Sequence, residues 1–430
     1  MQTNTFQLLK EQFHISDAVL ELVDQSEREV SPLFDRLDDV MAFNQYKILS
    51  AFQANKITDR HFSWNTGYGY DDMGREALDQ VFADVFHTEA ALVRPIIVNG
   101  THALTLAIVG VLRPGEELIY SSGAPYDTLE EVIGIRGEGK GSLKDYGISY
   151  KQVELTADGK IDFEALRAAI GPATKLVSLQ RATGYDWRKA ITIEEIAEWA
   201  AFVKEIDPNI ITMVDNCYGE FLHVKEPTDV GVDIMAGSLI KNPGGGIALT
   251  GGYVAGRKDL IENVSYRMTS PAIGGECGLQ FGQTRTMLQG LFIAPKTVNG
   301  AVKGAILCAK VFEKLGYDVC PMAEDTRSDI IQAVRLGSPE AVEAFCKGIQ
   351  AAAPIDSNIT PVPCETPGYE DPVIMAAGAF IQGSSIELSA DAPMRAPYNV
   401  YFQGGLTYEH SKFGVIRALQ ELVDEGLVEL

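Results

Sequence analysis

The chain has 430 residues and a formal net charge of −23, with 46% hydrophobic and 22% charged residues. This length exceeds one ordinary hydrophobic core and predicts two or three domains. The acidic balance argues against nucleic acid as a partner, because phosphate backbones select basic surfaces. The six cysteines show neither zinc-site spacing nor a dense disulfide pattern, so we expect reduced thiols and no metal.

The N-terminal part of the sequence is helical in pattern. Residues 1 to about 60 place apolar side chains at helical spacing, which predicts a helical segment. We expect no signal peptide and a cytoplasmic location, because no basic region precedes an apolar run here. No window reaches the run of about 18 apolar residues that a membrane helix needs, so we expect no membrane partner. The polar, glycine-rich stretch HFSWNTGYGYDDMGRE that follows is typical of an exposed loop.

Short apolar runs and helical stretches alternate from about residue 85 to 255. The expected strands are 91–97, 116–121, 149–155, 175–180, 210–215, 233–239 and 251–256. The expected helices are 101–112, 126–136, 162–170 and 192–205. The last of these begins with a capping box formed by Thr192 and Glu195. This alternation predicts an α/β fold with a mostly parallel central sheet and helices on both faces.

The pattern changes after about residue 290. A long helical stretch, VNGAVKGAILCAKVFEKLG, leads into mixed strand and helix segments and a final helix, YEHSKFGVIRALQELVDEG. This predicts a smaller α+β C-terminal domain. We therefore expect an N-terminal helical segment at 1–60, a large domain at 61–290 and a small domain at 291–430.

Two candidate binding features follow expected strands. The segment NGTH opens a helix at Gly100 and Thr101. Such a helix start offers free N–H groups to an anion, and Thr101 adds a hydroxyl; the alternative is a simple helix cap. Tyr126 follows the next strand, where its ring can stack on a planar cofactor; the alternative is a surface turn.

Two ionisable residues end later strands. Asp215 closes the apolar run IITMVD, at the edge where open sheets bind ligands. A buried carboxylate there needs a cationic or hydrogen-bond partner; the alternative is a cap for the next turn. Lys241 follows DIMAGSLI, where burial should lower the pKa of its amine and suit it to Schiff-base formation. The alternative is an exposed lysine in a turn.

These four features together match one cofactor. They offer an anion cradle, a stacking ring, an acid for a ring nitrogen and an amine for an aldehyde, and pyridoxal 5′-phosphate (PLP) carries the four matching groups. A P-loop is excluded, because its glycines precede the lysine whereas here they follow Lys241. A nucleotide-binding or NAD-linked module would want G-x-G-x-x-G after the first strand, and VNGTHAL lacks it.

The sequence resembles PLP enzymes of fold type I, and within them the methionine γ-lyase/cystathionine lyase group in its aluminium-resistance branch. The segments that carry the resemblance are GYGYDDMGRE, VRPIIVNGTHAL, SSGAPYDTLEEVIG, VDNCYGEF, GSLIKNPGGGIALTGGY and SSIELSADAPMRAPYNVYFQGGL. They span the chain from about residue 60 to its end. The resemblance implies an aspartate-aminotransferase-like fold.

The resemblance also implies roles for the residues around the cofactor. Gly100, Thr101 and Ser238 would hold the phosphate. Tyr126 would stack on the pyridine ring, with Asp215 at its nitrogen and Lys241 bonded to the aldehyde. The family's Ser-x-Thr-Lys pattern is incomplete here, because Ile240 precedes the lysine and one hydroxyl is lost.

Further residues follow from the resemblance alone. In the family, a Tyr-x-Arg element reaches the site from a neighbouring subunit, which points here to Tyr70 as a cofactor-binding residue and to Arg75 beyond it, at a different spacing. Arg395 would bind the substrate carboxylate, which suits an arginine fork; the alternative is an ordinary surface arginine. The resemblance therefore implies a homo-oligomer, a dimer or a homotetramer, with shared active sites.

The expected reaction is elimination from a sulfur-containing amino acid, like that of a methionine γ-lyase or cystathionine lyase, to a 2-oxo acid, ammonia and a thiol. Lys241 would remove the α-proton and Tyr126 would protonate the leaving sulfur. A PLP-dependent aminotransferase or aldolase shares the same cofactor residues and stays an alternative. A non-catalytic PLP-binding protein is a third.

Overall fold

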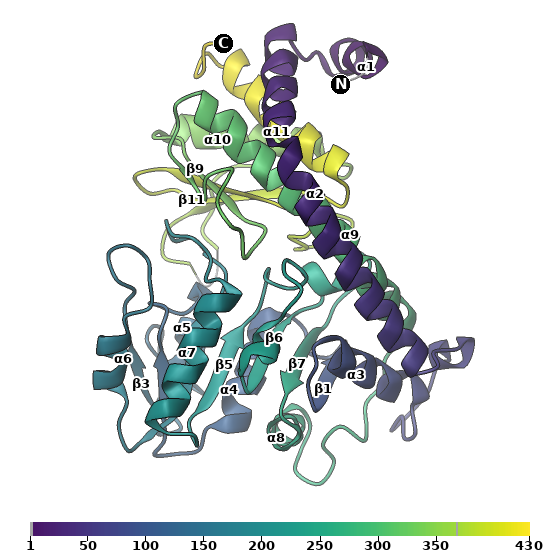
Figure 1. Ribbon diagram of the computed structural model, residues 1–430, viewed down its shortest axis with the longest axis vertical. Helices are drawn as coiled ribbons and strands as arrows, with labels where there is room; N and C mark the ends of the chain where they lie inside the picture. Colours follow the sequence, from purple (N-terminus) through teal and green to yellow (C-terminus); the bar gives the residue numbers. More distant parts are fainter. Residues whose placement is uncertain (1–2, 367–368) are drawn as a thin grey trace. The chain divides into compact units, whose positions relative to one another are not determined.

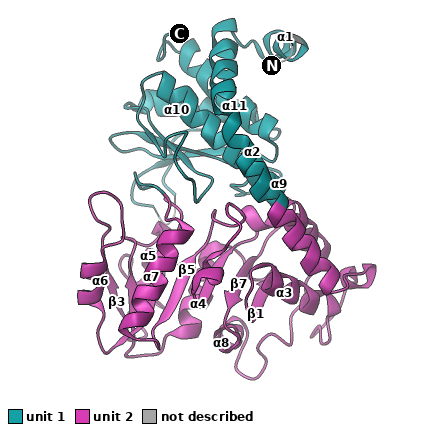
Figure 2. Ribbon diagram, viewed as in Figure 1, with its two compact units in different colours: residues 1–42, 185–189, 295–430 teal, residues 43–184, 190–294 magenta. Residues whose placement is uncertain are grey.

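The computed structural model describes residues 3–366 and 369–430, so the first two residues of the predicted helical segment lie outside it (Figure 1). The chain forms two compact units (Figure 2). Unit 1 comprises residues 1–42, 185–189 and 295–430, and unit 2 comprises residues 43–184 and 190–294. Two long helices, α2 (Asp17–Ala54) and α9 (Thr284–Lys314), each contribute residues to both units.

Unit 2 is built on a seven-stranded sheet with the order β1-β7-β6-β5-β4-β2-β3. Its strands are β1 (Ala90–Arg94), β2 (Glu117–Tyr120), β3 (Ser149–Gln152), β4 (Thr174–Gln180), β5 (Ile211–Asp215), β6 (Ile234–Ser238) and β7 (Gly252–Gly256). All neighbours from β3 to β6 pair in parallel, whereas β7 runs antiparallel to both β6 and β1. The predicted mostly parallel sheet is confirmed, with β7 as the reversed strand.

Helices cover both faces of this sheet, as the alternating sequence predicts (Figure 1). They are α3 (Met73–Val85), α4 (Gly100–Val111), α5 (Asp127–Ile133), α6 (Phe163–Ala169), α7 (Ile193–Ile206) and α8 (Lys258–Met268). Successive strand residues alternate between two cores: Met213 of β5 packs with α4 and α8, and Val214 packs with α3 and α7. The capping box at the start of α7 is present, with Thr192 accepting from the Glu195 N–H.

Strand register brings the carboxyl ends of three parallel strands together. Gln180, the last residue of β4, pairs with Asp215, the last residue of β5. Asp215 in turn pairs with Ala236, so Ser238 ends β6 two residues beyond it. Side chains that end these strands therefore meet at one edge, where loops of an open sheet bind ligands.

Unit 1 contains a five-stranded antiparallel sheet with the order β10-β11-β12-β9-β8. Its strands are β8 (Val319–Cys320), β9 (Gln332–Arg335), β10 (Val373–Ala377), β11 (Ser389–Pro393) and β12 (Asn399–Gln403). Its other helices are α1 (Thr3–Phe13), α10 (Pro339–Ala352) and α11 (Tyr408–Asp424). One core joins the sheet, these helices and the first turns of α2. Among the described residues, no helix combines the length and apolar character needed to cross a bilayer.

Candidate active site

A cavity of 170 Å³ opens in unit 2 at the carboxyl ends of the parallel strands. Six of the residues predicted from the sequence line it: Gly100, Thr101, Tyr126, Asp215, Ser238 and Lys241. They come from the start of α4, the residue before α5, the ends of β5 and β6, and the turn after β6. The fold thus brings together residues that are up to 141 positions apart in the sequence, from Gly100 to Lys241.

The N-terminus of α4 forms one wall of the cavity. The helix cap is Asn99, whose side chain accepts the His102 N–H at 2.8 Å, so Thr101 is not the capping residue. The Thr101 hydroxyl instead shares a hydrogen bond of 2.6 Å with the Thr128 hydroxyl. The first N–H groups of a helix attract anions, and Thr101 places a hydroxyl beside them.

Gly100 brings the backbone of α4 close to the ends of β5 and β6. A Cβ on Gly100 would lie 3.4 Å from both Cys217 Sγ and Ser238 Cβ. It would therefore occupy the gap between α4 and the ends of β5 and β6. Ser238 is buried, and its hydroxyl oxygen accepts the Ile240 N–H at 3.3 Å, which leaves the hydroxyl proton available to a ligand.

Asp215 is a buried carboxylate at the end of β5. Its Oδ1 accepts the Cys217 N–H at 3.0 Å. Burial raises the pKa of Asp215, although the Lys241 charge and the Cys217 hydrogen bonds act in the opposite direction. A protonated ring nitrogen facing this carboxyl would favour its ionised form.

Lys241 lies in the turn between β6 and the short helix η3 (Asn242–Gly244). Its Nζ lies 4.1 Å from the centre of the Tyr218 ring, within cation–π range. Burial lowers the pKa of Lys241, but the surrounding groups Cys217, Tyr218, Asp215 and Glu220 raise it, and the net direction is upward. The expectation of a lowered pKa was wrong, because groups at the end of β5 and in the turn after it outweigh desolvation.

Tyr126 stands at the start of α5 with a half-buried side chain. A Cβ on Gly184 would lie 3.7 Å from Tyr126 Cδ2 and 2.8 Å from Gln180 Nε2. Gly184 adopts φ +60°, so it allows the chain to pass close to both side chains. The ring of Tyr126 is thereby held at the cavity wall.

Sequence reasoning missed several residues of the cavity wall. Cys217 and Tyr218 follow Asp215 directly, and Gln180 ends β4. The position of Gln180 at a strand end, like that of Asp215, was a usable signal. No signal in the sequence pointed to Tyr218, because the contact of its ring with Lys241 depends on a turn in which Tyr218 has a φ of +70°.

Two predicted residues do not line this cavity. Tyr70 is 61% exposed, and the hydrogen bond of its hydroxyl with the Cys277 thiol raises the pKa of Tyr70. Arg395 belongs to unit 1, where its 53% exposed side chain pairs with Asp371 at 3.1 Å. Their predicted roles stay predictions.

Arg75 differs from Tyr70, although it follows only five residues later, in the first turn of α3. Its guanidinium is fully buried and donates to the backbone oxygens of Gly69, Gly278 and Glu276 at 2.6, 3.0 and 2.9 Å. Arg75 therefore fixes the loop that carries Tyr70 and does not reach outward.

The residues of the cavity fit PLP. The helix start with two hydroxyls suits a phosphate, and Gly100, Thr101 and Ser238 all line the cavity. A buried carboxyl suits a pyridine nitrogen, an amine suits an aldehyde, and a tyrosine ring suits a planar heterocycle. No group of His, Cys, Asp or Glu in the described part of the chain could hold a metal ion.

Comparisons with known proteins agree with this reading of the cavity. The family model described as methionine gamma-lyase matches residues 19–423. A carbon–sulfur lyase involved in aluminium resistance from Clostridium novyi NT is 52% identical, with a TM-score of 0.94 over 98% of this chain and 100% of that one. An uncharacterized protein from Bacillus subtilis, YnbB, is 51% identical over 94% of this chain and 96% of its own length.

A more distant relative carries an enzyme name from the same group. The L-methionine gamma-lyase of Pseudomonas putida is 23% identical over 46% of this chain and 45% of its own length. The match of the family model over nearly the whole chain, together with the cofactor-binding character of the cavity, settles the family and its cofactor, PLP. This chain belongs to the methionine gamma-lyase family of PLP-dependent carbon–sulfur lyases.

Proposed function

We propose that this carbon–sulfur lyase eliminates a thiol from a sulfur-containing amino acid and yields a 2-oxo acid and ammonia. The observation that carries the proposal is the single cavity that joins Lys241, Asp215 and Tyr126 to the start of α4. An amine for proton transfer, an acid for a ring nitrogen and a phenol for a leaving group lie on its walls. Both β- and γ-elimination use this set.

The cofactor would be held from three sides. Gly100, Thr101 and Ser238 would bind its phosphate, Asp215 would face its ring nitrogen, and Lys241 would bond its aldehyde. When bound, PLP supplies an electron sink that stabilises negative charge at the substrate α-carbon. Asp215 would support this, because a carboxylate facing the ring nitrogen favours a positive charge on that nitrogen.

Lys241 is the proposed general base. Once the substrate amine has replaced it, its free amine takes the proton from the α-carbon and becomes an ammonium. The Tyr218 ring, 4.1 Å from Nζ, and the carboxyl of Asp215 favour that ammonium. The proton is thereby stored close to the reacting carbon and is available for the later return step.

Tyr126 is the proposed acid for the leaving sulfur. The carbon–sulfur bond breaks with both electrons moving to sulfur, and the phenol proton of Tyr126 completes the thiol. Water then releases ammonia and the 2-oxo acid. Replacing Tyr126 by Phe keeps the stacking ring and removes the proton, so we expect PLP binding to persist while thiol release slows.

Arg395 is the proposed partner of the substrate carboxylate. It would have to exchange its ion pair with Asp371, which is exposed and therefore worth only about 0–1 kcal/mol. Arg395→Lys should raise KM for the amino acid more than it lowers kcat, because a lysine loses the two-pronged contact. An unchanged KM would remove Arg395 from the site.

We further propose a homo-oligomer in which Tyr70 enters the cavity of a second copy. Tyr70 is 61% exposed, stacks on Tyr68 with ring centres 5.4 Å apart, and does not line the cavity of its own chain. The buried Arg75 holds the supporting loop in place for such a contact. A dimer and a homotetramer both satisfy this arrangement, and a cytoplasmic location stays a prediction from the sequence.

Mixed oligomers test the shared site. Lys241→Ala and Tyr70→Ala subunits, each inactive alone, are co-expressed, which allows one intact site in each hybrid dimer. If Tyr70 acts across the interface, about a quarter of the wild-type activity returns, because half of the dimers are hybrids and each has one intact site of two. No recovery, with hybrids shown to form, would place Tyr70 in its own subunit's site, and full activity of Tyr70→Ala alone would place it outside catalysis.

The lyase function is tested by spectrum, mapping and product analysis. We expect a yellow protein, and borohydride reduction followed by mass spectrometry should place the phosphopyridoxyl group on Lys241. A panel of sulfur amino acids should yield thiol, ammonia and 2-oxo acid, and Lys241→Ala should abolish this whereas Lys258→Ala, at an exposed lysine, should not. Exchange of the amino group with a second 2-oxo acid, without thiol, would make the protein an aminotransferase.

A further inference from the structure

A buried acid in the turn after β5 and a buried phenol on β7 form a pair. Glu220 and Tyr253 are both 0% exposed, and the Tyr253 hydroxyl donates to Glu220 Oε1 at 2.7 Å. The other carboxyl oxygen, Oε2, is buried and has no hydrogen-bond partner among the residues that the structure describes. The proposed reaction assigns no role to this carboxyl, whether it is protonated or ionised.

The fold reserves space for this pair. A Cβ on Gly237 of β6 would lie 2.6 Å from Tyr253 Cε1 and 2.7 Å from Glu220 Oε1, closer than side-chain atoms approach each other. Only glycine therefore allows Glu220 and Tyr253 to meet across β6. The Asn242 side chain donates to the Glu220 backbone oxygen at 3.0 Å, which ties the turn after β5 to the residue that follows Lys241.

Several ionisable groups face Glu220 from neighbouring elements. Tyr253 lies on β7, Lys241 follows β6, Cys217 shares the turn after β5, and Glu226 lies in the segment before η2 (Pro227–Val230). Glu226 has its own partners: its Oε1 accepts the Phe221 N–H at 2.9 Å and its Oε2 lies 3.6 Å from an Arg181 nitrogen.

These surroundings place the titration of Glu220 near neutral pH. Burial raises the pKa of Glu220 to about 8, with a smaller contribution from Glu226, while the Tyr253 hydrogen bond and the Lys241 charge act in the opposite direction. In turn, the charge on Glu220 contributes to the raised pKa of Lys241. Each of the two groups therefore changes the proton affinity of the other.

We propose that Glu220, held by Tyr253 and tied to the residue after Lys241, is a positioning residue that sets the protonation state of the nitrogen of Lys241. The inference rests on the proposed role of Lys241 as the residue that bonds the cofactor and moves the α-proton. When Glu220 is ionised, its negative charge favours a proton on the Lys241 nitrogen. When Glu220 is neutral, that nitrogen releases its proton more readily, as a general base must before each turnover.

The visible absorbance of the bound cofactor reports this effect directly, because the band changes with protonation of the nitrogen of Lys241. We expect Glu220→Gln, which keeps the shape and removes the charge, to move the midpoint of the spectral pH titration of the holoenzyme downward by about one pH unit. The sign follows from loss of a negative charge beside a cation. An unchanged midpoint in Glu220→Gln would overturn the inference.

A second variant keeps the carboxyl and changes its hydrogen bond. Tyr253→Phe removes the donor that favours the carboxylate, so the pKa of Glu220 rises and Glu220 ionises only at higher pH. The midpoint should therefore shift downward in this variant too, by less than in Glu220→Gln. If Glu220→Gln fails to fold, the Tyr253→Phe shift decides alone: a downward shift supports the inference and none overturns it.

Controls separate this effect from general loss of packing. Glu117→Gln changes a buried glutamate at the start of β2, which accepts a hydrogen bond from the Thr174 hydroxyl. The spectral pH titration of this variant should match that of the wild type. The proposed function can fail separately from the inference. A yellow protein that releases no thiol, with a shifted midpoint in Glu220→Gln, overturns the lyase function and supports the inference about Glu220. An enzyme that releases thiol, with an unshifted midpoint in Glu220→Gln, supports the lyase function and overturns the inference.

Discussion

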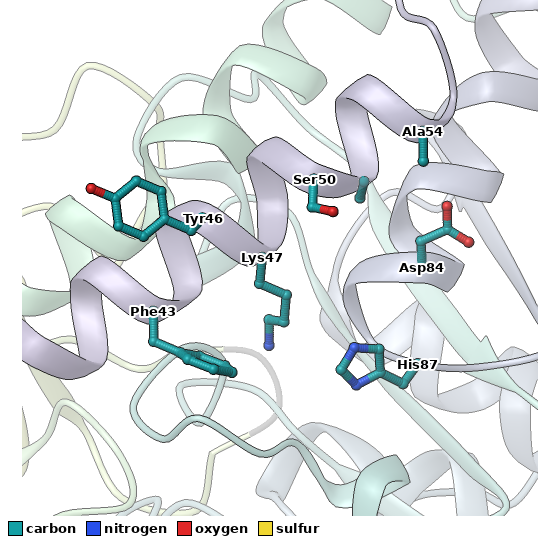
Figure 3. Close-up of a pocket in the computed structure, with 8 residues that line it drawn as sticks. Phe43, Tyr46, Lys47, Ser50, Ala54, Asp84 and His87 are labelled. Atoms are coloured by element: carbon teal, nitrogen blue, oxygen red, sulfur yellow. The ribbon is translucent and has the colours of Figure 1, made fainter.

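Replacing Lys47 by methionine should stabilise the protein. Lys47 extends from α2 between Phe43 and His87, into a surface hollow of 540 Å³ (Figure 3). Within the described residues its Nζ is buried and has no hydrogen-bond partner. An unpartnered buried donor costs roughly 1–3 kcal/mol, and more when it is charged. Methionine keeps the length of the side chain and removes the charge.

Electrostatic attraction offsets part of this cost. Burial lowers the pKa of Lys47, while the negative charges of Glu226 and Asp229 raise it, and the net direction is downward. We therefore expect Lys47→Met to raise the free energy of unfolding by about 1–2 kcal/mol, the lower part of the range for an unpartnered donor. Thermal unfolding of holoenzyme should show it as roughly 2–4 °C for each kcal/mol.

A matched lysine in the same unit should respond in the opposite direction. Lys204 Nζ bonds the Ile210 backbone oxygen and Asp233 Oδ2, both at 2.6 Å. Lys204→Met leaves these acceptors without their donor and should destabilise unit 2 by about 1–3 kcal/mol. Opposite shifts for the two variants exclude a general effect of adding methionine.

The pH dependence of the Lys47 effect has a definite sign. Because the folded-state pKa of Lys47 lies below its ordinary value of 10.5, the unfolded chain binds more protons between those two values. Stability of the wild type therefore rises with pH across that window, and the advantage of Lys47→Met narrows there. An equal or lower unfolding temperature for Lys47→Met at pH 7, or a constant advantage up to pH 10, would refute the reasoning.

Three further substitutions test the site and its scaffold. Asp215→Asn should lower PLP affinity about a hundred-fold or more in equilibrium dialysis, because losing one partner of a buried ion pair costs roughly 3–5 kcal/mol; equal affinity would deny its contact with the ring nitrogen. Gly100→Ala places a Cβ 3.4 Å from two side chains of the cavity and should weaken PLP binding by about ten-fold, or about 1.4 kcal/mol, while the circular dichroism spectrum shows that the fold is preserved. Thr192→Ala removes the cap of α7, in which Thr192 and Glu195 bond each other's backbone, and should cost about 1 kcal/mol in urea unfolding without changing PLP affinity.

The central part of the site followed from the sequence because strand ends are visible in it. An apolar run that stops at a polar residue marks both the strand and its end, as in IITMVD and DIMAGSLIK. In a parallel sheet all such ends share one edge, so Asp215 and Lys241 could be placed together without knowing strand order, whereas Ser238 came from the family resemblance. The same reasoning would have included Gln180.

Other features depend on contacts that no local pattern encodes. The run GGYVAG resembles the parallel strands, because apolar content carries no strand direction, yet β7 is antiparallel. The place of Tyr218 below Lys241 follows from a turn with positive φ. Tyr70 and Arg75 lie five residues apart, but only the structure shows that Tyr70 is exposed and that Arg75, in α3, is buried and donates to three carbonyl groups.

The upward shift of the Lys241 pKa shows why the position of a residue at a strand end does not suffice to predict its proton affinity. A lysine judged alone loses charge on burial, and the sequence offers no reason to expect otherwise. Asp215 ends β5, Glu220 lies in the turn that follows it, and Tyr253 holds Glu220 from β7, on the other side of β6. The proton affinity of Lys241 is therefore a property of three adjacent strands, and Gly237 on the middle one is as necessary to it as any ionisable group.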